Sequence, residues 1–101
     1  MARPSALTPE QLDAAMAGLP DWSVRDGMLH AEFVFADFAL AFGFMAAVAT
    51  EAARLDHHPE WTNVYSRVTV GLVTHDVGGI TGLDLELAGR MSALAMGFTK
   101  P

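Results

Sequence analysis

The sequence predicts a two-layer α+β domain, in which helices cover one face of a four-stranded antiparallel sheet. Three observations lead to this fold class. Helical spacing of apolar residues recurs in three segments, strand-like alternation recurs in two regions, and turn signals separate them. The predicted order is therefore α-β-β-α-β-β-α. The chain of 101 residues forms a single domain, 1–101, in which we expect residues 1–6 to be a loose arm.

The first helix and the first strand pair have clear boundary signals. Thr8 is a predicted N-cap, Pro9 occupies the first helical position, and Gln11 closes a capping box. Strands are predicted at 22–25 and 28–35, joined by Asp26-Gly27, a dipeptide typical of two-residue hairpin turns. The face of the second strand that we predict to be core consists of Leu29, Ala31, Phe33 and Phe35.

A long apolar helix follows, capped by Asp37 and running to about Asp56, because Pro59 excludes helical conformation just before it. Its predicted apolar stripe consists of Phe38, Phe42, Met45, Ala49 and Ala52, widened by Phe44, Val48 and Leu55. A helix this apolar must be covered on more than one side, by its own domain or by a partner subunit. The longest apolar run, 38–50, is too short to span a bilayer, so we expect no membrane partner.

The last third of the chain predicts a β-rich region and a third helix. The pattern of residues 61–74 leaves open one bent strand or a hairpin about Ser66, and 76–79 is a predicted loop. Thr81 caps the last helix, and Asp84 closes its capping box. Glu86 and Arg90 have the spacing of a helical ion pair. The predicted buried stripe of this helix consists of Leu83, Leu87, Met91 and Leu94.

Composition limits the class of function. The net charge of −6 argues against nucleic acid as a partner, because no basic stripe is present. The absence of cysteine excludes disulfides and thiolate metal sites and fits a reducing, cytoplasmic compartment. Residues 1–9 lack the apolar stretch of a signal peptide. An apolar fraction of 51% and two open sheet edges predict a homo-oligomer, either a homodimer or a homotetramer.

Three of the four histidines gather around one segment, Leu55-Asp56-His57-His58-Pro59-Glu60-Trp61, with His75 following a valine-rich run. Histidine exchanges protons near neutral pH, so the cluster predicts a catalytic corner if the helix end and strand end share one edge of the sheet. A metal site using Asp56 is an alternative, but adjacent helical residues do not easily reach one ion. His30 lies on the other face of its strand, and we expect it to be solvated.

The motif Asp56-His57-His58-Pro59-Glu60-Trp61, followed by Asn63-Val64-Tyr65, Val68-Thr69-Val70 and Thr74-His75, resembles the pterin-4a-carbinolamine dehydratase family. The resemblance covers about residues 7–96. It implies two strands within 61–74 and a dimer or a dimer of dimers. It also implies a hydro-lyase in tetrahydrobiopterin recycling, which removes water from a 4a-hydroxytetrahydropterin by histidine acid–base catalysis without metal or cofactor.

The candidate site therefore has two sets of residues. The predicted catalytic residues are His57, His58 and His75, and the sequence does not decide which is acid and which is base. The predicted substrate-binding residues are Trp61, Asp84, Asp56 and Pro59. Asp84 is first of all a helix cap, and Pro59 and Glu60 are first of all scaffold.

One position departs from the family pattern. Relatives often have an acidic residue four positions before the first histidine, where this chain has Ala53, so turnover is expected to be weaker if that carboxylate matters. The competing function is a protein-binding module acting through the apolar helix. The resemblance implies this role too, because some members stabilise dimers of a homeodomain transcription factor. The histidine cluster favours the enzyme.

Overall fold

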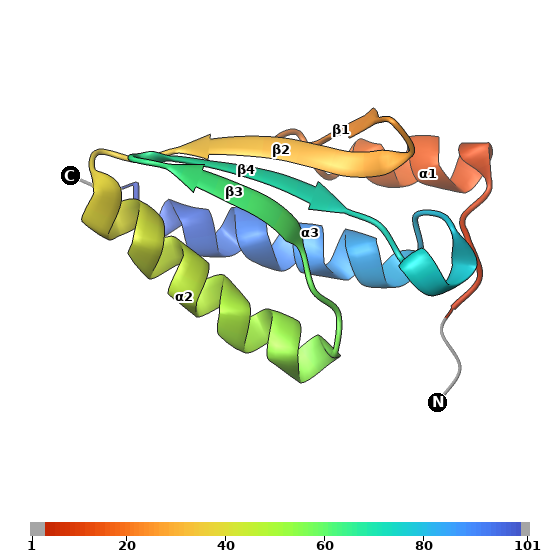
Figure 1. Cartoon of the computed structure of the whole chain (residues 1–101). Helices are drawn as coiled ribbons and strands as arrows, with labels where there is room; N and C mark the ends of the chain where they lie inside the picture. The colour runs from red at the N-terminus through yellow and green to blue at the C-terminus, as the bar shows by residue number, and fades with distance from the viewer. Residues whose placement is uncertain (1–3, 100–101) are drawn as a thin grey trace.

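The computed structural model describes residues 4–99, and it confirms the predicted α+β fold. The elements are α1 (Pro9–Met16), β1 (Ser23–Arg25), β2 (Met28–Val34), α2 (Phe38–Leu55), β3 (Glu60–Val64), β4 (Arg67–Leu72), a short 3-10 turn η1 (His75–Val77) and α3 (Gly82–Met96). The strands form one antiparallel sheet in the order β1-β2-β4-β3. In Figure 1, α2 and α3 lie against one face of this sheet, and α1 lies near β1, at the end of the sheet away from the start of α2.

All predicted helix caps are present. Thr8 and Gln11 form the capping box of α1, the Asp37 carboxylate accepts from the backbone N–H of Leu40, and Thr81 and Asp84 form the capping box of α3. Of the predicted arm, residues 1–3 lie outside the described part, and residues 4–6 have no regular secondary structure. The backbone N–H of Leu7 then donates to the Ile80 carbonyl at 2.8 Å, which joins this segment to the start of α3.

Both predicted hairpins form. Residues 26–27 have φ of 53° and 76°, the left-handed pair that an Asp-Gly turn provides. The run 61–74 is two strands rather than one bent strand, with a turn at 65–66 in which Tyr65 has a φ of 52°. The side-chain amide of Asn63 donates to the carbonyls of Tyr65 and Arg67 at 3.1 and 2.9 Å, and so holds the turn closed.

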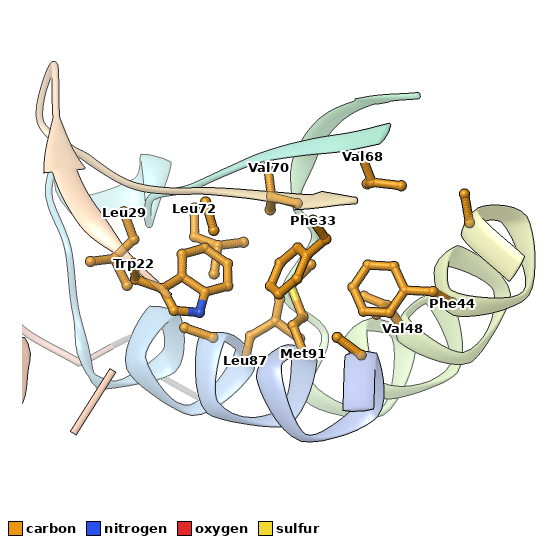
Figure 2. Packing of buried hydrophobic residues seen from close by; sticks show 14 of the residues in the cluster. Trp22, Leu29, Phe33, Phe44, Val48, Val68, Val70, Leu72, Leu87 and Met91 are labelled. Carbon is orange, nitrogen blue, oxygen red and sulfur yellow. The ribbon is translucent and has the colours of Figure 1, made fainter. Parts of the chain in front are cut away.

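The core lies between the sheet and the helices. β2 and β4 pair in register, and Figure 2 shows Phe33 and Val70 of the sheet facing Leu87 and Met91 of α3. The Phe33 and Phe44 ring centroids are 5.1 Å apart. Trp22 precedes β1 rather than starting it, and its indole N–H donates to Ser92 Oγ at 2.9 Å. The sheet is therefore fastened to both α2 and α3.

The inward face of α2 differs from the predicted stripe. The buried residues are Ala41, Phe44, Val48 and Ala52. Ala52 was in the predicted stripe, but Phe44 and Val48, which were expected only to widen it, lie at its centre, and Leu55 is half-buried. Phe38 and Phe42 point outward, 50% and 57% exposed, with ring centroids 5.9 Å apart. The prediction failed because apolar residues occur almost all round this helix, so spacing alone does not identify the face that meets the sheet.

α2 also raises the question of a membrane. The apolar run 38–50 had suggested that this segment is too short to cross a membrane. The helix continues to Leu55, however, so its length does not exclude a membrane span. By length and composition alone it meets the criteria for a membrane helix, with a mean hydropathy of 1.4 over 18 residues. Core helices meet the same criteria, and α2 contributes one face to the core.

The buried face of α3 is also rotated relative to the prediction. Leu87 and Met91 are buried as expected, whereas Leu83 and Leu94 are only half-buried. The rest of the buried face consists of Asp84, Ala88 and Ala95. The predicted pair of Glu86 and Arg90 is present at 2.6 Å, and Glu51 of α2 also accepts from Arg90. These hydrogen bonds, that of Glu51 first, raise the pKa of Arg90, so one guanidinium links the two helices.

Candidate active site

The end of α2 places the two adjacent histidines in different environments. Asp56 is left-handed, with φ 51° and ψ 45°, and its N–H donates to Ala53 O at 3.2 Å. The N–H of His57 donates back to Ala52 O at 3.0 Å. These two bonds form a Schellman motif, which ends the helix at Leu55, four positions before Pro59, and turns His57 back toward the domain. As a result His57 is buried, at 5% exposure, and His58 is exposed.

His57 is held by a buried carboxylate. Its Nε2 lies 2.5 Å from Oδ1 of Asp84, which has no exposed surface. The other oxygen, Oδ2, accepts from the Thr81 backbone N–H and from Thr74 Oγ1, both at 2.8 Å. A carboxylate only accepts hydrogen bonds, so Nε2 of His57 must be the donor. Asp84 thus joins the end of β4, the start of α3 and the end of α2.

The threonine hydroxyls complete this network. Thr74 donates to Asp84, so at the 2.8 Å contact between the two hydroxyls Thr81 donates and Thr74 accepts. Thr81 Oγ1 in turn accepts from the Leu83 N–H at 3.2 Å. Among the described residues, no buried side-chain nitrogen or oxygen is left without a hydrogen-bond partner. Such a network is rigid because every member is satisfied.

The second ring nitrogen of His57 faces the solvent side. Within residues 4–99 Nδ1 of His57 has no hydrogen-bond partner, and no unpartnered nitrogen of the described side chains is buried. Nδ1 must therefore be accessible, and His57 lines a pocket. Since Nε2 carries the proton donated to Asp84, Nδ1 of the neutral ring has a free lone pair.

His75 reaches the same region from the sheet. It opens η1, separated from β4 by Val73 and Thr74, in a loop closed by the Thr74 N–H donating to Gly79 O at 3.0 Å. Gly78 accepts a φ of 67° in this loop, a conformation suited to glycine. The ring is exposed, and its Nε2 lies 2.6 Å from Oε2 of Glu60 at the start of β3.

The three histidines meet at one pocket of about 180 Å³. Among residues 4–99 its lining consists of His57, His58, Val73, Thr74, His75 and Asp76. The predicted shared edge of helix end and strand end is therefore present. Sequence reasoning assigned no role to Thr74, although it adjoins His75 in the motif. Its burial and its bond to Asp84 depend on contacts between distant segments, which no local pattern shows.

The other predicted site residues lie around this pocket rather than in its lining. Asp84 reaches it through His57, and Asp56 ends α2. Pro59 is half-buried between the histidines and β3. Trp61 is half-buried against the core and, with Glu60, lines a second hollow formed by residues of β2, β3 and β4. Whether these four side chains bind substrate stays a prediction.

Three further expectations can be compared with the structure. Ala53, in the position where relatives often have an acid, is exposed near the end of α2. His30 is half-buried on the open face of the sheet, where its Nε2 lies 3.5 Å from Nη1 of Arg25, so it is less solvated than expected. In the described part of the chain, no three His, Asp or Glu side chains are arranged to hold a metal ion.

Comparison with known proteins assigns the family. The model of the family described as "Pterin 4 alpha carbinolamine dehydratase" matches residues 5–94. A protein of Solibacter usitatus named "Putative pterin-4-alpha-carbinolamine dehydratase" is 48% identical over 90% of this chain and 96% of its own. One of the same name from Rhodopseudomonas palustris is 53% identical over 88% and 90%.

Two solved structures are also similar. A transcriptional coactivator/pterin dehydratase from Brucella melitensis is 44% identical with a TM-score of 0.88, over 90% of this chain and 99% of its own. A pterin dehydratase-like RuBisCO assembly factor of the alpha-carboxysome shares only the fold, at 23% identity and a TM-score of 0.61, over 73% and 86%. By its matched sequence, its fold and its histidine motif, the chain belongs to the pterin 4 alpha carbinolamine dehydratase family.

Proposed function

We propose that this protein is a 4a-hydroxytetrahydropterin dehydratase, a hydro-lyase that releases water and the quinonoid dihydropterin. The observation that carries the proposal is the meeting of three histidines, from a helix end and a strand end, at one pocket. Family membership supports the same chemistry. Surface histidines without a role would not need a buried hydrogen-bond network behind one of them.

The reaction needs one acid and one base. The C4a–O bond breaks, and the leaving hydroxyl takes a proton and departs as water. N5 loses its proton, and the electron pair of that N–H bond forms the C4a=N5 double bond. No electrons pass to another molecule, so we propose that imidazoles suffice and that no metal or cofactor takes part.

We assign the base to His57. Its Nδ1 is the accessible nitrogen, and its Nε2–H is fixed on Asp84. A proton taken from N5 would make the ring cationic, and the buried carboxylate would stabilise that charge at a distance of 2.5 Å. The acid is then His58 or His75, both of which are exposed at the pocket. Asp84 acts through His57, and Trp61, Asp56 and Pro59 remain the proposed contacts of the substrate.

A second function has one observation in its favour. Phe38 and Phe42 form an exposed aromatic pair on α2, which fits binding to another protein chain. The Brucella melitensis relative is named both coactivator and dehydratase. A binding module alone would not require the pocket histidines, so we propose the enzyme as the main function. We place it in the cytoplasm, in tetrahydrobiopterin recycling, with neither nucleic acid nor membrane as a partner.

The test is a stopped assay of 4a-hydroxytetrahydropterin dehydration with and without pure protein. His57→Ala, His58→Ala and His75→Ala should each lower kcat by about 10²–10⁴-fold. Double substitutions should lose less than the product of the singles, because groups that act together are non-additive. His30→Ala, outside the pocket, is the control and should be near neutral. If all three single variants keep nearly full activity, these histidines are not the catalytic groups; if the pure wild-type protein has no activity, the binding module replaces the enzyme.

A further inference from the structure

Glu60 and His75 form a contact that the mechanism above does not use. Glu60 is the first residue of β3 and pairs with Gly71 of β4, so its backbone is fixed by the sheet. Pro59, directly before it, has a fixed φ. The carboxylate reaches across the end of β4 to η1, where Oε2 lies 2.6 Å from Nε2 of His75. A rigid strand start therefore holds a loop histidine.

This contact matters because the His75 ring has little other support from the described residues. The side chain of His75 is 73% exposed, in contrast to that of His57, which is 6% exposed and enclosed by its surroundings. Within residues 4–99, the Glu60 carboxylate is the sole hydrogen-bond partner of the His75 ring. An exposed histidine without such a partner would sample several rotamers, and few of them would present a nitrogen to the pocket.

The contact also selects the nitrogen. The carboxylate accepts, so Nε2–H of His75 donates to it. Glu60 is not among the residues that line the histidine pocket, so Nε2 of His75 is occupied by a partner from outside that lining. The nitrogen left for a ligand is Nδ1, as in His57. Two of the three pocket histidines are thus held by a carboxylate at Nε2, one in the core and one at the surface.

We propose that Glu60 is a positioning residue for His75, holding Nε2 outside the pocket so that Nδ1 meets the bound pterin. The inference rests on the proposed dehydratase function for its consequence in catalysis. Because both side chains are more than half exposed, the pair is screened by water, and the effect should be modest. Loss of a surface ion pair of this kind should change kcat by about two- to fivefold.

The kinetic test compares Glu60→Ala, Glu60→Gln and Glu32→Ala. Glu60→Ala should lower kcat by about two- to fivefold with KM unchanged, because orientation of an acid–base group matters in the transition state. Glu60→Gln should recover most of this loss, since its amide oxygen still accepts from Nε2–H. Glu32→Ala is the matched control. It removes an equally exposed strand carboxylate, which lies 3.4 Å from Arg67 on the open face of the sheet, and should have no effect.

Two measurements separate positioning from a structural role. In the His75→Ala background, Glu60→Ala should have no further effect on kcat, because Glu60 acts only through His75. NMR relaxation of the ring carbons should show that His75 becomes more mobile in Glu60→Ala and stays ordered in Glu60→Gln. An active wild type with unchanged ring order in Glu60→Ala, or an added loss in the double variant, would overturn the inference. A wild type without dehydratase activity would instead overturn the proposed function.

Discussion

Replacing Asp84 by asparagine is the most informative single change in this structure. The carboxylate accepts three hydrogen bonds, from His57 Nε2 at 2.5 Å and from the Thr81 N–H and the Thr74 hydroxyl at 2.8 Å. An asparagine of the same shape has one accepting oxygen and one donating amino group. Its amino group must therefore face former donors, either the His57 ring or the Thr81 backbone N–H together with the Thr74 hydroxyl.

The two orientations have different costs. The Thr81 N–H cannot change its character, and leaving it unsatisfied costs about 1–3 kcal/mol. The His57 ring can respond by moving its proton from Nε2 to Nδ1. We therefore expect the amino group of the introduced asparagine to donate to Nε2 of His57. The nitrogen at the pocket then carries a proton and cannot act as the base.

Asp84→Asn should accordingly lose most of its activity while keeping its fold. Loss of the base should lower kcat by about 10²–10⁴-fold. The neutral amide makes weaker hydrogen bonds than the charged carboxylate, and this should lower the free energy of unfolding by roughly 1–3 kcal/mol. A loss of 1 kcal/mol corresponds to about 4–8 °C in the Tm of a domain of this size. ¹⁵N NMR of the histidine rings should show the proton moved to Nδ1 of His57.

Gln11→Ala provides the matched control. Gln11 occupies the same third position of a capping box in α1, far along the chain from the histidine motif. Its loss should cost about 0.3–1.5 kcal/mol and leave kcat unchanged. If Asp84→Asn loses stability but keeps kcat within about threefold of wild type, Asp84 is only a helix cap, and the assignment of His57 as base fails.

Three further predictions follow from the composition and packing of the chain. Dehydratase activity should survive exhaustive chelation, and loss restored by one divalent ion would favour a metal site instead. Light scattering should give a dimer or, as we expect, a tetramer, and Phe42→Asp should lower that mass; a wild-type mass near 10.8 kDa at micromolar concentration would refute the oligomer. Gly89→Ala should stabilise by about 0.5–1 kcal/mol, since its Cβ meets nothing within 4 Å. Gly43→Ala should gain less in thermal denaturation than Gly89→Ala, because its Cβ would lie 2.8 Å from Phe98 Cε1; equal gains would contradict this reasoning.

Local chemistry explains what the sequence could predict. The caps at Thr8, Asp37 and Thr81, the Asp26-Gly27 turn and the alternation of β2 each depend on residues close together in the chain, and all are present. The inward face of α2 could not be predicted, because it depends on where β4 and α3 pack. Phe44 rather than Phe42 faces the core, and both are equally apolar.

For the candidate site, too, the sequence predicted the local features but not the contacts between distant segments. The histidines were visible as a cluster, but the difference between His57 and His58 depends on a left-handed Asp56, an uncommon conformation for any residue but glycine. The capping role of Asp84 was visible from Thr81 three residues before it. Its bond to His57 joins residues 27 apart in the chain and needed the packed structure.

Asp84 is both the cap of α3 and the partner of His57, so it couples opening of the first turn of α3 to the proposed catalytic pocket. The first turn of a helix is ordinarily among the first parts of a domain to open, at little free-energy cost. In α3 that turn cannot open without releasing the carboxylate that holds His57. Thr74 and Thr81 both donate hydrogen bonds to this carboxylate, and their hydroxyls also bond to each other, so they restrain this opening. Substitutions that loosen the start of α3 should therefore inactivate the pocket at temperatures where the rest of the sheet is still folded.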